Sequence, residues 1–178
     1  MQSYAALLRG IMPSNPNMRN EKLRGVFTDL GFEQVASVLS SGNVVFRSAP
    51  ADPSRLEDRI QRGLNEQLGI AGGTLVRDYQ TLRDLLDRDP FDGLVHERGS
   101  YLTVTFFKNA IADPEPAIPA DPLTRVIGYD EPSRALLTVI DNTPKTPDFM
   151  SWLDKTYGKD ITTRTWLTVQ KVVKKMEA

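Results

Sequence analysis

The order in which strand and helix patterns follow one another restricts the fold of this chain more than any other feature. In the first half we predict, in this order, a strand at 3–9, a helix capped by Asn17 or Asn20, strands at 35–39 and 44–47, a helix beginning at Asp52-Pro53, and a strand at 74–77. Gly31 and Gly69 end the two helices, and the connection 40–43 is typical of a hairpin. The order β-α-β-β-α-β is that of the ferredoxin-like fold.

The second half of the chain repeats this order. After a helix at 78–88 and the connection 89–100, we predict strands at 101–107, 123–128 and 135–140, a helix beginning at Thr146-Pro147, a strand at 161–163, and a helix from about Thr165. One element is missing from the repeat. Four prolines between Asn109 and Pro122 exclude the first crossover helix, because proline is not tolerated in a helix interior.

A match between single residues supports the repetition. At an offset of 87 residues, Val76–Leu82 falls on Thr163–Val169 and matches an arginine, a capping residue, an aromatic residue and a threonine. We therefore predict an α+β protein that is a tandem repeat of two ferredoxin-like β-α-β-β-α-β subdomains, each followed by a helix. The expected boundaries are 1–88 for the first subdomain and its helix, 89–100 for the connection, and 101–178 for the second subdomain and the C-terminal helix.

The composition removes many classes of chemistry. The 178 residues include no Cys and one His, which excludes disulfides, Cys and His zinc sites, iron–sulfur clusters and thiol nucleophiles. The nucleotide-binding and hydrolase motifs G-x-x-x-x-G-K-[ST], G-x-G-x-x-G and G-x-S-x-G do not occur. We expect neither a metal nor a cofactor.

The net charge and the hydropathy of the chain restrict which partners the protein can bind and in which compartment it is expected. Lys+Arg number 22 and Asp+Glu 23, so a net charge of −1 gives no field that attracts nucleic acid. RNA recognition by the sheet would need more aromatic residues than Tyr4 and Phe46 on the first and third strands. No apolar run reaches the ~18 residues of a membrane span, and the N-terminus lacks the basic region of a signal peptide. These observations predict a cytoplasmic protein that binds neither membrane nor nucleic acid.

The predicted fold gathers polar residues at one end of the first sheet. Strand 1 of a ferredoxin-like unit is antiparallel to strand 3, so Arg9 and Gly10 should lie beside the hairpin residues Ser41, Gly42 and Asn43. The first helix begins at the same end, with its free N–H groups and positive dipole end. This combination suits an oxyanion such as phosphate or carboxylate. The alternative is that the hairpin residues serve only the turn.

A second candidate anion site lies at the start of the last helix, at Thr163 and Arg164. Hydroxyls and an arginine at a helix N-terminus suit an anion, and Trp166 offers a ring for stacking. The alternative, in which a threonine caps the helix and Trp166 belongs to the core, is favoured because residues 77–79 have the same role in the first repeat. His96 stands among charged neighbours and is expected to be a solvated surface residue.

Two separated motifs resemble the signatures of a known family. They comprise Tyr4-Ala5-Ala6-Leu7-Leu8-Arg9-Gly10-Ile11, Leu23-Arg24, Leu30-Gly31-Phe32, Val35 and Ser41-Gly42-Asn43-Val44-Val45-Phe46, and then Thr162-Thr163-Arg164, Trp166, Thr168-Val169 and Lys171. Together they are similar to the domain of unknown function 1697 family over essentially the whole chain. Many members have Asn-Val-Gly-Gly where this chain has Met12-Pro13-Ser14-Asn15. The resemblance implies a small bacterial-type cytoplasmic protein of two ferredoxin-like subdomains, and it implies no activity or catalytic residue.

The two candidate anion sites predict a metal-independent binding module for a small anionic or nucleotide-like ligand. Arg9, Ser41 and Asn43 would hold the ligand, with Arg164 as a separate or contributing site. Two alternatives stay open: an enzyme acting on a phosphate- or carboxylate-bearing substrate, and a protein-interaction module that uses sheet or helix faces. Turnover of phosphoesters would favour the enzyme, and stable co-purification with one protein would favour the interaction module.

Overall fold

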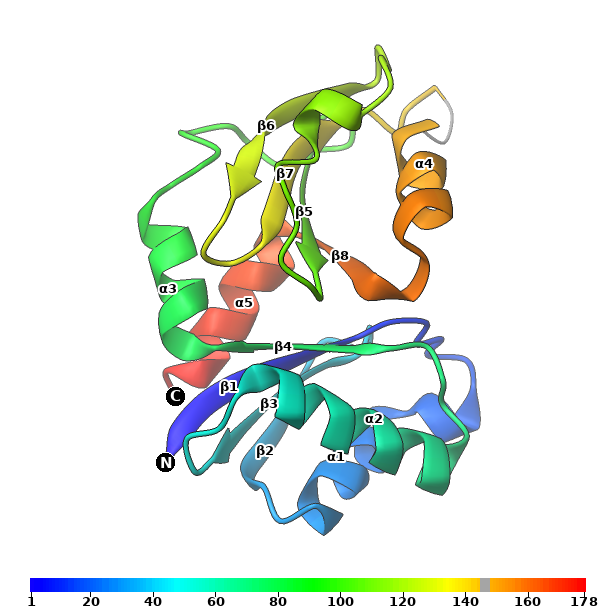
Figure 1. Ribbon diagram of the computed structural model, residues 1–178, viewed down its shortest axis with the longest axis vertical. Coiled ribbons are helices and arrows are strands. Elements are labelled where there is room, and N and C mark those ends of the chain that lie inside the picture. Colours follow the sequence, from blue (N-terminus) through cyan, green and yellow to red (C-terminus); the bar gives the residue numbers. More distant parts are fainter. Residues whose placement is uncertain (145–147) are drawn as a thin grey trace. The chain divides into compact units, whose positions relative to one another are not determined.

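The computed structural model describes residues 1–144 and 148–178 and divides into two compact units. The first unit comprises Met1–Leu82 and Lys171–Ala178, and the second comprises Arg83–Gln170. Each unit contains one four-stranded antiparallel sheet, and five α-helices accompany the sheets in the described residues, so the protein is α+β (Figure 1). None of the described helices combines the length and apolar character that crossing a membrane requires.

Two helices cover one face of the first sheet. The elements are β1 (Gln2–Leu8), η1 (Pro16–Met18), α1 (Asn20–Asp29), β2 (Glu33–Val38), β3 (Asn43–Ser48), α2 (Pro53–Leu68), β4 (Thr74–Asp78), the start of α3 (Tyr79–Asp87) and the end of α5 (Trp166–Met176). The strands lie in the order β2-β3-β1-β4, with α1 and α2 on the same side (Figure 1). The ring of Phe46 is central to the core, with its centroid 4.5 Å from Phe32, 5.4 Å from Phe27 and 5.7 Å from Tyr4.

The caps of α2 are as predicted, and the cap of α1 is not. Asp52 Oδ1 accepts the Ser54 N–H at 2.9 Å before α2, and Gly69 follows it with a φ of 68°. Arg19 precedes α1, and no side chain caps that helix. The expectation that Asn17 or Asn20 caps α1 is therefore wrong. The side-chain amide of Asn20 instead donates to the carbonyl oxygen of Leu39 at 2.8 Å, a contact that local sequence does not specify.

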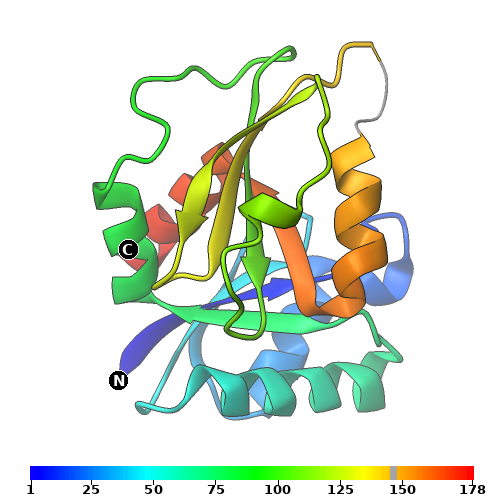
Figure 2. The same ribbon diagram turned by 45° about the horizontal axis from the view of Figure 1, so that its top comes forward.

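The second unit has the same strand order and, in its described residues, one helix fewer. Its elements are the rest of α3, β5 (Tyr101–Phe107), η2 (Glu115–Ala117), β6 (Thr124–Asp130), β7 (Ala135–Ile140), α4 (Asp148–Tyr157), η3 (Gly158–Asp160), β8 (Ile161–Thr165) and the start of α5 (Trp166–Met176). The sheet order is β6-β7-β5-β8. The predicted helix start at Thr146-Pro147 lies outside the described residues. As the prolines predicted, the segment 109–122 has no α-helix, and η2 with α4 flanks the sheet (Figure 2).

An acidic and a basic side chain cover the outer edge of β4. The Glu57 carboxylate, on α2, accepts the backbone N–H of Val76 at 2.9 Å, and the Arg77 guanidinium donates to the Val76 carbonyl oxygen at 3.0 Å. Arg77 Nη1 and Glu57 Oε2 are 3.9 Å apart, and both side chains are buried. An outer strand otherwise presents unpaired backbone groups, so these two side chains satisfy the N–H and the carbonyl oxygen of Val76 at the edge of the sheet.

The end of β1 approaches the loop before β4 so closely that only glycine fits. A Cβ atom on Gly72 would lie 2.0 Å from the carbonyl oxygen of Arg9. We expect Gly72→Ala to lower the free energy of unfolding by about 1–3 kcal/mol, because the backbone must shift to accept the methyl group. Urea denaturation measures this change.

Gly25 supplies the control for this substitution. It lies in the middle of α1, and its added Cβ would meet no atom within 4 Å. Gly25→Ala should raise the free energy of unfolding by about 0.5–1 kcal/mol, since alanine is the better helix former. Equal effects of the two substitutions would show that the contact between Gly72 and Arg9 is not tight.

Candidate functional site

Three segments that the sequence predicted to converge do meet in the first unit. Leu7 on β1 pairs with Asn43 on β3, and the Leu8 N–H donates to the Gly42 carbonyl oxygen at 2.8 Å. The bond from Asn20 to Leu39 places the start of α1 beside the same hairpin. We call this end of the first sheet the hairpin rim; it comprises Arg9, Gly10, Ser41, Gly42 and Asn43.

The hairpin residues of the rim also hold the turn. Asn43 is buried, and its side-chain amide donates to the Val38 carbonyl oxygen at 2.9 Å and to Ser41 Oγ at 3.0 Å. Gly42 has a φ of 84°, and a Cβ there would lie 2.7 Å from a side-chain carbon of Ile11. These contacts engage the Asn43 amide within the hairpin, whereas the Ser41 side chain is exposed.

The other predicted pair, Thr163 and Arg164, lies on β8 in the second unit. The hydroxyls of Thr163 and Thr105 are 2.9 Å apart, and Arg164 Nη1 donates to Thr162 Oγ1 at 2.6 Å and to the Thr163 carbonyl oxygen at 3.0 Å. Burial lowers the pKa of the Arg164 guanidinium to about 10, because desolvation disfavours its charge. Both side chains therefore have partners within the protein.

Trp166 and the cap before it have the structural roles that were favoured for them. Thr165 Oγ1 accepts the Thr168 N–H at 3.3 Å, which caps α5. Trp166 is buried and packs edge-to-face against Phe91, with ring centroids 5.1 Å apart. This confirms that Trp166 is a core residue and not an exposed stacking platform.

His96 is not the solvated residue that its charged neighbours suggested. Its side chain is half-buried, its Nδ1 accepts the backbone N–H of Leu102 at 3.1 Å, and its ring stacks on Tyr101 with centroids 4.9 Å apart. Glu97 and Ser100 form a β-bridge just after it, which turns the chain back so that His96 reaches β5. The partners of this histidine are a backbone group and a ring brought to it by that turn, so the charge of its neighbours did not indicate them.

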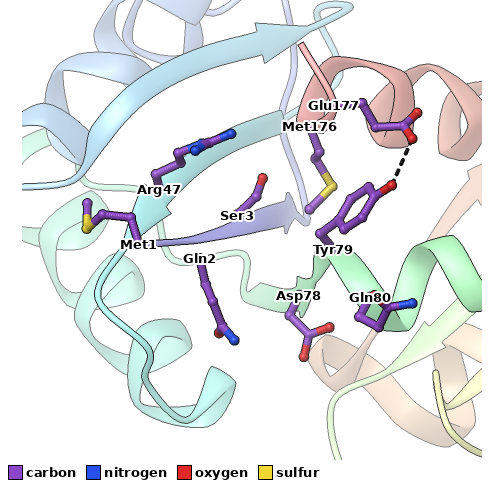
Figure 3. A pocket seen from close by; sticks show the side chains of 9 residues that line it. All are labelled: Met1, Gln2, Ser3, Arg47, Asp78, Tyr79, Gln80, Met176 and Glu177. Carbon is purple, nitrogen blue, oxygen red and sulfur yellow. Dashed lines mark hydrogen bonds between the residues drawn. The ribbon is translucent and has the colours of Figure 1, made fainter.

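A pocket in the first unit was not predicted from the sequence. It has a volume of about 570 Å³ and lies where β1 begins and where β3 and β4 end (Figure 3). Its lining residues come from four separate stretches of the chain: Met1, Gln2, Ser3, Arg47, Asp78, Tyr79, Gln80, Met176 and Glu177. We call it the Arg47 pocket.

The Arg47 pocket contains a cation and a hydroxyl side by side. Arg47 on β3 and Ser3 on β1 are directly opposite in the strand register, so their side chains leave the same face of the sheet. Both are half-buried. Within the residues that the structure describes, neither the Arg47 guanidinium nor the Ser3 hydroxyl has a hydrogen-bond or ion-pair partner.

The opposite side of the Arg47 pocket is partly apolar and is held in place. The Tyr79 hydroxyl donates to Glu177 Oε2 at 2.8 Å, which ties the start of α3 to the end of the chain (Figure 3). Met176 beside it is buried. Asp78 Oδ1 accepts the Thr81 N–H at 2.8 Å and so caps α3. The strand alternation places Arg47 on the face opposite Phe46, but no local pattern indicates that residues 176–177 return to this unit.

Comparison with known proteins identifies a family. The chain matches the family described as "Protein of unknown function (DUF1697)" over residues 1–126. The chain belongs to this family. The match confirms the family resemblance and covers the first of the two sequence motifs, while the second, at residues 162–171, lies outside the matched range. The family brings no activity to the residues above.

A solved structure supports the fold. The conserved bacterial protein SP0830 from Streptococcus pneumoniae is similar to this DUF1697 protein with a TM-score of 0.74 and 18% sequence identity, covering 100% of this chain and 99% of that chain. At this identity the likeness concerns the fold alone. No curated protein matches the chain significantly.

Proposed function

We propose that the protein is a metal-independent binding module for a small anionic ligand, which binds in the Arg47 pocket. One observation carries this proposal: Arg47, a half-buried arginine whose guanidinium has no protein partner among the described residues, lines a cavity of about 570 Å³. Arginine stays charged at physiological pH and has five N–H donors in a fixed fork. A carboxylate or phosphate fits this fork with two parallel hydrogen bonds.

The other lining groups narrow the class of ligand. The Ser3 hydroxyl can donate a third hydrogen bond to the anion beside Arg47, while Tyr79 and Met176 offer apolar contact to the rest of the ligand. Asp78 and Glu177 also line the pocket and repel additional negative charge. We therefore propose a ligand with one carboxylate or phosphate group on a small, partly apolar body, and not a polyphosphate.

A melting screen tests the proposal. Monocarboxylates, sugar phosphates and nucleoside monophosphates are added to the wild type and to Arg47→Ala. A ligand at 100 times its Kd should stabilise the wild type by about 2.7 kcal/mol, and this shift should disappear in Arg47→Ala. Arg55→Ala, an exposed arginine on α2, is the matched control and should respond like the wild type.

The same screen decides between this pocket and the sites predicted from the sequence. The hairpin rim, with Arg9, Gly10, Ser41, Gly42 and Asn43, stays a candidate for the same anion, as do Thr163 and Arg164. A ligand shift that survives Arg47→Ala and disappears in Arg9→Ala would move the site to the rim. A shift lost only in Arg164→Ala would move it to β8. No shift with any anion would overturn the binding module.

We also infer that the two units are ferredoxin-like subdomains derived from one tandem duplication. Equal strand orders in the two sheets support this inference. So do equivalent contacts at the offset of 87 residues. Arg77 and Arg164 each donate from Nη1 to the carbonyl oxygen of the preceding residue at 3.0 Å. The next residues, Asp78 and Thr165, each accept the backbone N–H of the threonine three positions later.

A further inference from the structure

We propose that the outer edge of β2, together with a row of lysines at the end of α5, binds an acidic polypeptide segment that adds to the first sheet as an extra strand. We call this surface the lysine edge; it comprises Ser37, Val38, Lys171, Lys174 and Lys175. It involves neither Arg47 nor the hairpin rim, so it is independent of the anion site.

The strand β2 offers backbone groups for such an addition. It is an outer strand of the first sheet and pairs with β3 on its inner side. A bulge between Glu33 and Ala36, where Gln34 has a φ of 49°, makes the first half of the strand irregular. The second half, Ala36–Val38, pairs regularly with β3. An added strand therefore has a regular template beginning at Ala36.

A hollow separates this part of β2 from the lysines. Ser37 and Val38 line a cavity of about 320 Å³ together with Lys171, Lys174, Lys175 and Ala178. The three lysines are spaced i, i+3 and i+4 on α5, so they share one face of the helix. A peptide lying along β2 would have this face of α5 at its side.

The charge of the lysine edge selects an acidic partner. All three lysines are exposed, and none has a hydrogen bond or an ion pair among the residues that the structure describes. In strand addition the backbone hydrogen bonds give affinity, and alternate side chains give specificity. Glutamate or aspartate at alternate positions would meet these cations.

Two further roles for the lysines fit this surface less well. Single-stranded nucleic acid usually binds where aromatic side chains offer stacking, and none of the residues lining this cavity is aromatic. Lys174 and Lys175 lie in the last turn of α5 and favour the helix dipole there. That effect does not account for Lys171 or for the hollow beside β2.

Fluorescence anisotropy with a defined probe tests the proposal. The probe is a labelled eight-residue peptide in which Glu and Val alternate, acetylated and amidated at its ends. It should bind the wild type, and Lys174→Glu/Lys175→Glu should weaken binding at least about tenfold by replacing attraction with repulsion. Hydrogen exchange at the amides of residues 36–38 should slow when the peptide is bound.

Matched controls make each outcome decisive. Arg55→Glu/Arg62→Glu changes the charge by the same amount at exposed positions of α2 and should leave binding unchanged. The same peptide N-methylated at every residue keeps its charge but has no backbone N–H left to donate to β2, so it should bind at least about tenfold more weakly. The proposal would be overturned if the methylated peptide bound as tightly as the unmodified one, or if the α2 variant lost as much affinity for the peptide as the lysine variant. It would also be overturned if an oligothymidylate of similar length bound the wild type more tightly than the peptide does.

Discussion

Replacing Trp166 with alanine is expected to lower the free energy of unfolding by about 3–5 kcal/mol, the usual cost of removing a large aromatic side chain from a core. Trp166 is the first residue of α5, is 6% exposed, and packs against Phe91, which is 3% exposed. Truncation removes the edge-to-face contact and leaves a cavity beside the Phe91 ring. Water does not fill such an apolar cavity favourably. The atoms that surrounded the indole therefore lose their van der Waals contacts in the folded state.

Equilibrium unfolding in urea, followed by circular dichroism, measures this loss. Leu167→Ala is the matched control, because Leu167 is the next residue of the same helix and is 45% exposed. Its substitution should change the free energy of unfolding by no more than about 0.5 kcal/mol. A small effect of Trp166→Ala, comparable to that of Leu167→Ala, would show that the indole does not belong to the core.

Most element positions could be predicted because their signals are local. Asp52, Pro53 and Gly69 define α2 by capping and by a left-handed backbone, and these effects act within a few residues. The apolar runs of β5 and β7 gave the observed bounds, Tyr101–Phe107 and Ala135–Ile140. The start of α1 could not be predicted in this way, because Asn20 bonds to Leu39, nineteen positions away.

The two candidate sites of the first unit also differ in how far the sequence could predict them. The meeting of the end of β1 with the hairpin at residues 41–43 follows from antiparallel pairing of the first and third strands, so topology predicted it. The Arg47 pocket joins residues near 3, 47, 79 and 177, and no periodicity or motif connects these four stretches. The environment of His96 could not be predicted either, because its partners are the Leu102 backbone and the Tyr101 ring, which no motif connects to it.

The buried pair of Glu57 and Arg77 gives the second large prediction. We expect Glu57→Ala to lower the free energy of unfolding by about 3–5 kcal/mol, the typical cost of removing one partner of a buried ion pair. Glu57 and Arg77 are 2% and 3% exposed, so water does not screen the remaining charge well. The substitution also removes the acceptor of the Val76 N–H on the outer edge of β4.

A double substitution separates the charge from the packing. Glu57→Leu/Arg77→Met replaces both charges with apolar side chains and should be more stable than Glu57→Ala, because no buried charge is left without its partner. Glu66→Ala, at an exposed position of the same helix, is the control and should change stability by no more than about 0.5 kcal/mol. If the double variant is instead less stable than Glu57→Ala, the two side chains stabilise β4 mainly through their hydrogen bonds to Val76. The ion pair would then be buried there because its two side chains hydrogen-bond the backbone at the edge of the sheet, and not because their opposite charges attract each other.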